Sequence, residues 1–530
     1  MLDLIRNHKI LTTLFILIIL FAGCLGYRMK GPYRSYRLDV IKPAPGESVT
    51  PGTLEVGVAK RDITPDMSKY DTWSDVDGDF HYRPDRGDTY QDLNKNGKFD
   101  AVWLAGFHSD RPAQGVNDPL WVRAIAFRNN GVTIAMATID GIGIFHEKFI
   151  KVRKMIDPSL KIDHVMFSSL HDHEAPDTMG LWSYSPFRPQ FDYDYMALVQ
   201  RACKEAVEEA VRNLQPVEMY GVEAPVDPEK FVRDTRQPIV YDKRLCLARF
   251  VKPGTDETVA TMMSWGNHAE ATGSKNLMVS SDFSHPWRLG VETGVPEPNG
   301  VKGLGGMCLY FQGMVGGLMT PLHLKVVHRN GKDVLEEDSF DKAAALGDNL
   351  AIFTVNALRS DKVWKVENPR VAFAAKTIYV PMARHFKYAI MLGLIHPGYF
   401  WGKARTEVNV FRIGELEILT LPGELYPEIG EGGIETPDGA DFPVEPVEVP
   451  ALRSQMKGKM NMIIGLANDE IGYIIPKSQW DVKPPYAYGR TDEPQYGEEN
   501  SGGPDVAPTI HREALALLDR AHAAWNLPGP

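Results

Sequence analysis

The chain carries its clearest chemical signal in the segment Ser168-Ser169-Leu170-His171-Asp172-His173-Glu174-Ala175-Pro176. A largely apolar run at 162–167 precedes this segment and predicts a buried strand, and the exit through Ala-Pro-Asp is typical of a loop. Two imidazoles at alternate positions beyond a strand end can reach one cleft, and neutral imidazole is a good zinc ligand. The alternative is a polar loop whose histidines only cap backbone groups. The motif alone leaves both interpretations open.

Strand-like and helical runs alternate on both sides of this motif. Apolar periodicity predicts strands at 132–139 and 415–421 and amphipathic helices at 195–214, 340–358 and 510–525. Thr509 is placed to cap the start of the last helix. No repeat, long low-complexity tract or clear boundary follows Leu54. We therefore predict one large α/β (mixed α+β) catalytic domain over residues 54–530.

The composition is that of a globular protein with a substantial core. Of the 530 residues, 43% are hydrophobic and 24% are charged. The formal net charge of -11 and the lack of a basic arm in the sequence argue against a nucleic-acid binder. The four cysteines are scattered and form no CxxC pair, which argues against a disulfide scaffold and against a thiolate zinc site.

The N-terminus predicts export and attachment to a membrane. Two basic residues precede an apolar run at 10–22, which has the length of a signal peptide. Phe21-Ala22-Gly23-Cys24 resembles a bacterial lipoprotein cleavage box, in which Cys24 would carry the lipid. If the apolar run is counted through Tyr27, an uncleaved signal anchor is equally consistent. Residues 1–27 are therefore predicted as a signal or membrane anchor in the cell envelope, and residues 28–53 as a linker.

An Asp-rich segment at 71–100 predicts a calcium-binding insert. Oxygen ligands recur at alternate positions from Asp92 to Asp100, and a glycine stands sixth, as in the front of an EF-hand loop. The glutamate expected at the twelfth position is replaced by Trp103. The alternative is a solvated turn rich in Asp and Asn. We favour a calcium ion because dense carboxylates repel one another unless a cation neutralises them. The predicted ligands are Asp92, Asn94, Asn96 and Asp100.

Three later segments are candidate companions of the histidine pair. His268 follows an apolar strand-like run at 259–263, and Glu424 stands just past a predicted strand on a Pro-Gly turn. Tyr473 lies beside another apolar run. Each signal is weak alone, because such residues also serve as hydrogen-bonded loop residues, as helix starts or as core packing.

Together these segments resemble the neutral/alkaline ceramidase family from about Leu54 to Trp525. The run Val56-Gly57-Val58-Ala59-Lys60-Arg61-Asp62-Ile63-Thr64-Pro65 is similar to the segment that opens the family, and the His-Asp-His segment is similar to its zinc motif. The resemblance implies four zinc ligands: His171, His268, Glu424 and Tyr473. It also implies that His173 contacts substrate or handles a proton. Further substrate-binding positions are Gly57, Arg233 and Tyr496.

The resemblance implies a zinc hydrolase that cleaves an amide bond in an N-acyl sphingoid or related N-acyl lipid, and the residue types suit hydrolysis at zinc. Two imidazoles and a carboxylate leave zinc a coordination position for water. Tyr473 could stabilise an oxyanion, and His173 could pass a proton to the leaving amine.

Three departures from the family leave the substrate open. The family carries a serine at the reaction centre, whereas the chain reads Gly316-Gly317-Leu318-Met319-Thr320-Pro321, so Thr320 is the only hydroxyl there. The Asp-rich insert is no part of the family pattern, and no counterpart of the C-terminal immunoglobulin-like domain is recognised. Two alternatives follow: a metal-dependent esterase or phosphoesterase, and a non-catalytic, calcium-binding surface protein.

Overall fold

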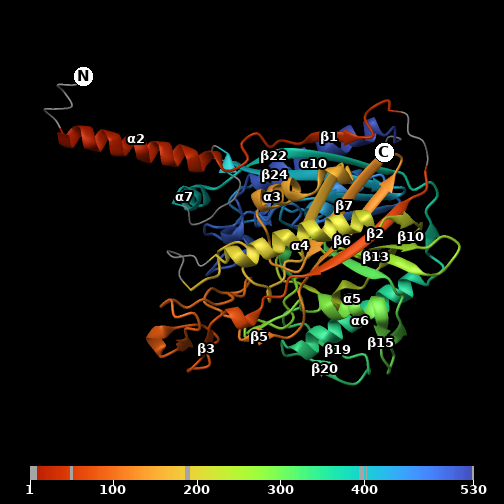
Figure 1. Cartoon of the computed structure of the whole chain (residues 1–530), viewed down its shortest axis with the longest axis horizontal. Coiled ribbons are helices and arrows are strands. Elements are labelled where there is room, and N and C mark those ends of the chain that lie inside the picture. The colour runs from red at the N-terminus through yellow and green to blue at the C-terminus, as the bar shows by residue number, and fades with distance from the viewer. Residues whose placement is uncertain (1–8, 48–51, 185–190, 393–398, 401–402, 528–530) are drawn as a thin grey trace.

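Three β-sheets pack around one central core in the computed structural model (Figure 1). The structure describes residues 9–47, 52–184, 191–392, 399–400 and 403–527. The first sheet has the order β8-β7-β6-β2-β9 (His164–Ser169, Val132–Ile139, Trp121–Asn129, Glu55–Asp62, Gln215–Pro216). The second has the order β17-β13-β12-β10-β21 (Met307–Gln312, Thr258–Trp265, Arg244–Val251, Glu218–Pro225, Trp364–Lys365). The third has the order β1-β22-β24-β25-β27 (Asp39–Lys42, Val371–Pro381, Lys403–Ile413, Leu416–Thr420, Met460–Ile464), and β23 (Tyr399–Phe400) pairs with β24.

Each sheet turns one face to the central core and the other to helices. Fully buried side chains from all three sheets meet in this core, among them Ile125, Met136, Phe250, Met262, Phe411 and Ile418. The outer faces are covered by α3 and α4 (His146–Met155, Tyr193–Arg212) on the first sheet, α5 and α6 (Ser284–Thr293, Phe340–Leu358) on the second and α10 (Val506–Ala524) on the third. Burial on both faces explains why these strands are near-continuous apolar runs.

The ends of the parallel strands meet at one place in the molecule. Each sheet contains one parallel pair, namely β7 with β8, β13 with β17 and β25 with β27. At these ends, the backbone of Ser168 bridges to Ala467, and the N–H of Gly465 donates to the carbonyl of Gln312. The loops that follow the parallel strands of the three sheets therefore lie against one another, although they are far apart in sequence.

The predicted mixed α/β fold is confirmed, and most predicted elements appear near their predicted bounds. The strand at 132–139 and the helix at 340–358 form as predicted. The last helix begins at Val506, so Thr509 lies inside it, and its hydroxyl donates to the carbonyl of Asp505. The N-cap role predicted for Thr509 is therefore wrong.

The predicted linker at 28–53 is wrong in part. Residues Asp39–Lys42 form β1, which pairs antiparallel with β22 at the edge of the third sheet. Val40 and Ile41 are β-branched, which suits a strand, and Pro43 ends the run. A strand of four residues gives too short a pattern to stand out in the sequence.

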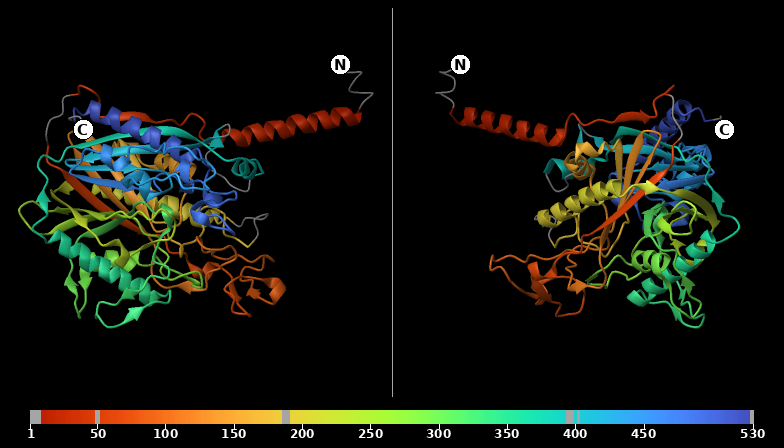
Figure 2. Two further views of the ribbon diagram at one scale, coloured as in Figure 1. Left: turned by 180° about the vertical axis from the view of Figure 1, so that it is seen from behind. Right: turned by 45° about the vertical axis from the view of Figure 1, so that its right-hand side comes forward.

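The N-terminal helix α2 (Lys9–Lys30) projects from the body in every view (Figure 2). Its apolar side chains, from Leu11 to Phe21, are largely exposed. Within the described residues, no helix meets the combined criteria of length and apolarity for a membrane span. The base of α2 contacts the short helix α7 (Arg384–Leu392).

The Asp-rich insert lies at one corner of the molecule and has a small core of its own (Figure 1). A hairpin of β3 (Thr72–Ser74) and β4 (Thr89–Gln91) carries part of it. The insert packs around aromatic side chains, including Trp73, Tyr82, Phe99 and Trp103.

Candidate metal centre and active site

Each of the three sheets delivers one predicted metal ligand to the place where the strand ends meet. His171 follows β8, His268 follows β13, and Glu424 follows β25 in the short strand β26 (Glu424–Leu425). The Nε2 atoms of His171 and His268 both lie 3.3 Å from Oε2 of Glu424. All three side chains are buried. Sequence positions separated by up to half the chain therefore form one cluster.

The two imidazoles are held in the tautomer that a metal requires. Nδ1 of His171 lies 2.9 Å from the carbonyl of Ile142, and Nδ1 of His268 lies 2.7 Å from the carbonyl of Met319. A carbonyl only accepts hydrogen bonds, so each Nδ1 carries the proton and each Nε2 presents a lone pair. Among the described residues, no group donates a hydrogen bond to Oε2 of Glu424.

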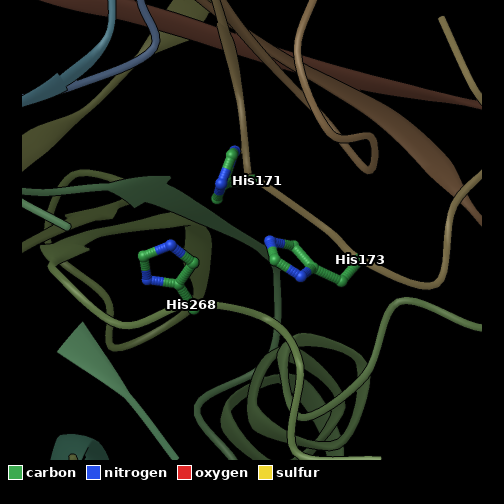
Figure 3. Close-up of side chains that lie close together, drawn as sticks. All are labelled: His171, His173 and His268. Carbon is green, nitrogen blue, oxygen red and sulfur yellow. The ribbon is translucent and has the colours of Figure 1, made fainter. Parts of the chain in front are cut away.

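His173 joins the same cluster from a different direction. Figure 3 shows its ring facing those of His171 and His268, and one nitrogen from each ring lies within 4.8 Å of the others. Its Nδ1 lies 3.0 Å from Oε2 of Glu270, a carboxylate that sequence reasoning did not single out. Burial lowers the pKa of His173 to about 4, although Glu270 opposes this shift.

A cavity of about 380 Å³ leads to this cluster. His171, His173, Glu424, Glu470 and Tyr473 are among its polar lining residues. The remaining wall is largely apolar and includes Phe107, Phe145, Met179, Leu181, Trp182, Met382, Phe386 and Ile471. A polar base beneath apolar walls suits a ligand with a polar reactive group and a long apolar part.

Tyr473 lies beside Glu424 because their short strands pair in parallel. β28 (Tyr473–Ile474) aligns Tyr473 directly with Glu424 of β26. Burial raises the pKa of the Tyr473 phenol well above its ordinary value of 10. Tyr496 also lines the cavity, but its side chain is 56% exposed and accepts a hydrogen bond from Asn500. Tyr473 is thus at the base and Tyr496 at the rim.

Thr320 reaches the site indirectly, and Arg233 lies outside the cavity wall. The hydroxyl of Thr320 donates to Oε1 of Glu270, so Glu270 connects Thr320 to His173. Arg233 pairs with Thr320 between β11 (Arg233–Asp234) and β18 (Met319–Thr320). Its side chain is exposed and donates to the carbonyl of His323 at 3.4 Å.

Gly57 and the predicted calcium ligands lie away from the cavity. A Cβ on Gly57 would overlap the backbone of Ala210 at the end of α4, so close packing requires glycine there. Among the described residues that line the cavity, none belongs to β2. In the insert, Asp92 accepts from the N–H groups of Asn96 and Gly97, and Asp100 accepts from Asn94 and Asn96.

A second group of buried residues, also not recognised from sequence, supports the histidines. The Nε2 of Gln312 donates to the carbonyls of Leu170 and Asn267, which directly precede His171 and His268. Arg111 is fully buried and donates to the carbonyl of His173. No local pattern marks these residues, because their partners come from distant segments.

Backbone geometry at the site also departs from the ordinary. His171 has φ +58°, a left-handed conformation that is uncommon outside glycine and that clusters at functional sites. Gly106 has φ +96°, and a Cβ there would overlap the ring of His173. The ring of His173 therefore lies directly against the backbone of Gly106.

The remaining carboxylates of the motif point away from the cluster. Asp172 accepts from the N–H of Glu174, and Glu174 accepts from Thr272 and Asn276. Glu174 also lies 3.4 Å from Arg111. These contacts leave neither carboxylate in the cavity wall.

The arrangement of the three sheets is a fold that is known from solved structures. No protein-family model matches the sequence, and no curated protein sequence is significantly similar to it. The neutral ceramidase from Pseudomonas aeruginosa is similar in structure, with a TM-score of 0.61 and 14% identity over 91% of this chain and 76% of that chain. A ceramidase complexed with C2 has a TM-score of 0.59, also at 14% identity, over 90% of this chain and 76% of that chain. The chain therefore has the fold of neutral ceramidase, as the sequence resemblance led us to expect.

Proposed function

We propose that the chain is a zinc-dependent hydrolase of the neutral ceramidase family that cleaves an amide bond in an N-acyl sphingoid or a related N-acyl lipid. The observation that carries this proposal is the convergence of two imidazole Nε2 atoms on one oxygen of Glu424 at the base of an apolar cavity. The fold of neutral ceramidase supports it.

The donor set fits zinc. Two imidazole lone pairs facing a carboxylate oxygen repel one another unless a cation lies between them. The carbonyls that fix each Nδ1 proton are the outer partners typical of zinc-binding histidines. Tyr473 lies beside Glu424 and is the fourth ligand that the family resemblance implies. Zinc, when bound, acts as a Lewis acid toward a carbonyl oxygen and makes water nucleophilic at neutral pH.

The residues around the cluster have separate roles in proton transfer and in positioning. Nε2 of His173 is buried and has no hydrogen-bond partner among the described residues, so it can accept the proton that the attacking water gives up and pass it to the leaving amine. Glu270 lies at the other ring nitrogen and, with Thr320 bound to its second oxygen, holds the orientation of His173. In this proposal Thr320 positions Glu270 and is not the nucleophile. If Tyr473, which is paired with Glu424 in the strand register, does not bind the metal, its phenol can donate a hydrogen bond to a carbonyl oxygen of the substrate.

The cavity wall favours a lipid over a phosphoester. Phe107, Phe145 and Trp182 are among the side chains that would contact an acyl or sphingoid chain and exclude water. A two-metal phosphoesterase needs further ligands, and Asp172 and Glu174 are engaged elsewhere.

The proposal includes attachment to a membrane through the N-terminal segment, with calcium bound in the insert. The apolar side chains of α2 are exposed, as is Cys24. Helix α7, which contacts α2, carries the basic residues Arg384 and Lys387 and contributes Phe386 to the cavity wall. A lipid substrate could then reach the cavity from the membrane that holds the protein.

Membrane attachment can be tested by cell fractionation. We expect the full chain in the membrane fraction after a high-salt wash and the Leu17→Lys/Leu20→Lys variant in the soluble fraction. A Cys24→Ser variant that becomes soluble assigns the attachment to a lipid, whereas one that stays bound assigns it to the helix. A wild type that remains soluble would refute the attachment.

Hydrolysis can be tested with wild type, His171→Ala and Glu424→Gln. We expect zinc in the wild type and fatty acid release from an N-acyl sphingosine. Each variant should lose the ion bound at this cluster, and its rate of fatty acid release should fall at least 100-fold. Zinc binding without amidase turnover, but with turnover of an ester or phosphoester, would favour the alternative enzymes. A wild type without zinc or turnover would leave only a binding protein.

A further inference from the structure

A second cluster of metal-ligand side chains lies where the Asp-rich insert meets the body. It consists of His81 from the insert and of His108 and Asp110 from the loop at 104–111. This loop is closed by a hydrogen bond from the N–H of Leu104 to the carbonyl of Arg111 and by the bridge from Trp103 to Pro112.

The loop at 104–111 contacts the active-site cavity on one side and the insert on the other. On one face, Gly106 and Phe107 line the active-site cavity, and the ring of Phe107 lies 4.9 Å from that of His173. On the other, His108 stacks on His81 with ring centroids 3.7 Å apart. An interaction that fixes His81 against His108 therefore also fixes the position of the loop that forms part of the cavity wall.

The three side chains present ligand atoms to one another at metal-binding range. One atom from each lies within 4.8 Å of the other two. Nδ1 of His108 lies 3.0 Å from the carbonyl of Ser109, which fixes its proton there and leaves Nε2 as a lone pair. His81 and Asp110 keep 20% and 25% of their side-chain surface exposed, so an ion from solvent can reach them.

Hydrogen bonding among these residues does not account for their arrangement. Nδ1 of His81 is buried without a hydrogen-bond partner in the described part of the chain. It lies 3.4 Å from Oδ1 of Asp110, beyond the 2.7–2.9 Å typical of a charge-assisted hydrogen bond. Arg83 approaches the other oxygen of Asp110 at 3.8 Å and leaves Oδ1 available.

We propose that His81, His108 and Asp110 bind a divalent transition-metal ion, with zinc as the preferred ion, and that this ion fastens the insert to the cavity wall. Two imidazoles and a carboxylate are ligands that zinc accepts, whereas calcium prefers oxygen ligands alone. The insert has only a small aromatic core, and segments of that size are commonly stabilised by a metal. This ion is distinct from the one proposed at His171 and does not depend on it.

The test is the zinc content of the full chain measured by inductively coupled plasma mass spectrometry. We expect two zinc ions per wild-type chain, one in His108→Ala and one in His171→Ala. Asp110→Asn is the second variant, because asparagine keeps the size and tolerates the φ of +62° at this position; it should also bind one ion. His323→Asn, a histidine with φ +57° outside both clusters, is the matched control and should bind two.

The outcomes separate this site from the proposed active site. If the wild type binds a single zinc ion that is lost in His171→Ala but kept in His108→Ala and Asp110→Asn, the second site is refuted and the proposed hydrolase stands. If the wild type binds a single zinc ion that is lost in His108→Ala but kept in His171→Ala, the second site is supported and zinc at the first site is refuted. Cobalt added to the His171→Ala protein should give visible absorption bands that the His171→Ala/Asp110→Asn double variant lacks, and equal spectra would also overturn the proposal.

Discussion

At the scale of single residues, the site depends on which nitrogen of each histidine carries a proton. His171 and His268 are both oriented by backbone carbonyls, so their lone pairs converge on Glu424. His173, only two residues from His171, is oriented by Glu270 instead. The two histidines of one sequence motif thus have different surroundings, and the separate roles predicted for them remain a prediction.

The contact between Gly106 and His173 gives a prediction at this scale. In Gly106→Ala, the added Cβ would overlap the imidazole ring and displace it. We expect the rate of amide hydrolysis to fall on the order of 100-fold, because an error of about 1 Å in a catalytic group has that effect. The zinc ion proposed at His171 and His268 should be retained, since the added Cβ touches neither residue.

The matched control for this variant is Gly87→Ala. Gly87 has φ +103°, close to the φ of +96° at Gly106, but a Cβ there would meet no atom within 4 Å. It therefore carries the same backbone strain without the clash. Equal losses of activity in the two variants would show that strain, and not displacement of His173, is the cause.

At the scale of elements, the parallel strand ends determine where the chemistry lies. The sequence predicted a strand before His171, before His268 and before Glu424, and these strands form. It could not show that the three strands belong to three different sheets. Strand pairing depends on contacts between distant segments, for which periodicity carries no information.

The insert gives a prediction at the scale of an element. The calcium site remains a prediction. Among its four predicted ligands, Asn94 and Asn96 donate to Asp100, and Asp92 accepts from the backbone N–H of Asn96. If calcium binds, it should order this loop and slow tryptic cleavage after the exposed residues Lys95 and Lys98. Cleavage can be followed by mass spectrometry with calcium or magnesium at 1 mM.

Two controls make this experiment specific. Cleavage after Lys332, an exposed residue in a different loop, should be the same with and without calcium. The Asp92→Asn variant should lose the protection, because Asp92 is the first ligand of the loop. Protection that persists in this variant would place calcium elsewhere.

At the scale of the whole molecule, a buried histidine in the central core predicts how stability depends on pH. Burial lowers the pKa of His164 from 6.5 to about 3, and nearby Arg153 adds to this shift while Glu407 opposes it. The unfolded chain takes up a proton near pH 6.5, whereas the folded chain does not until about pH 3. This group therefore stabilises the unfolded state progressively as pH falls from 6.5 to 3.

From this shift we expect His164 to cost about 2 kcal/mol of the free energy of unfolding between pH 7 and pH 5. His164→Gln keeps a donor for Asn409, which lies 3.0 Å from Nε2, and removes the titration. Urea unfolding at both pH values should therefore show a smaller loss in the variant than in the wild type. Equal losses would mean that other groups control the acid sensitivity.

Much of this molecule was predictable from sequence, for identifiable reasons. Long apolar strands and amphipathic helices follow local periodicity, and the candidate zinc ligands were named through a family resemblance. Gln312, Arg111 and Glu270 were missed because each acts through a contact with a distant loop. Thr509 was misplaced because the helix starts earlier than its capping signal indicated.

The supply of one ligand by each sheet has a consequence for how the protein matures. A chain in which only two sheets have docked lacks either a histidine or Glu424, and so offers no complete site. Contacts so distant in sequence form late in folding, because the intervening loops must close first. If zinc binds there as proposed, it would stabilise only chains whose three sheets have already met, and misassembled chains would lack the ion at this site and stay inactive.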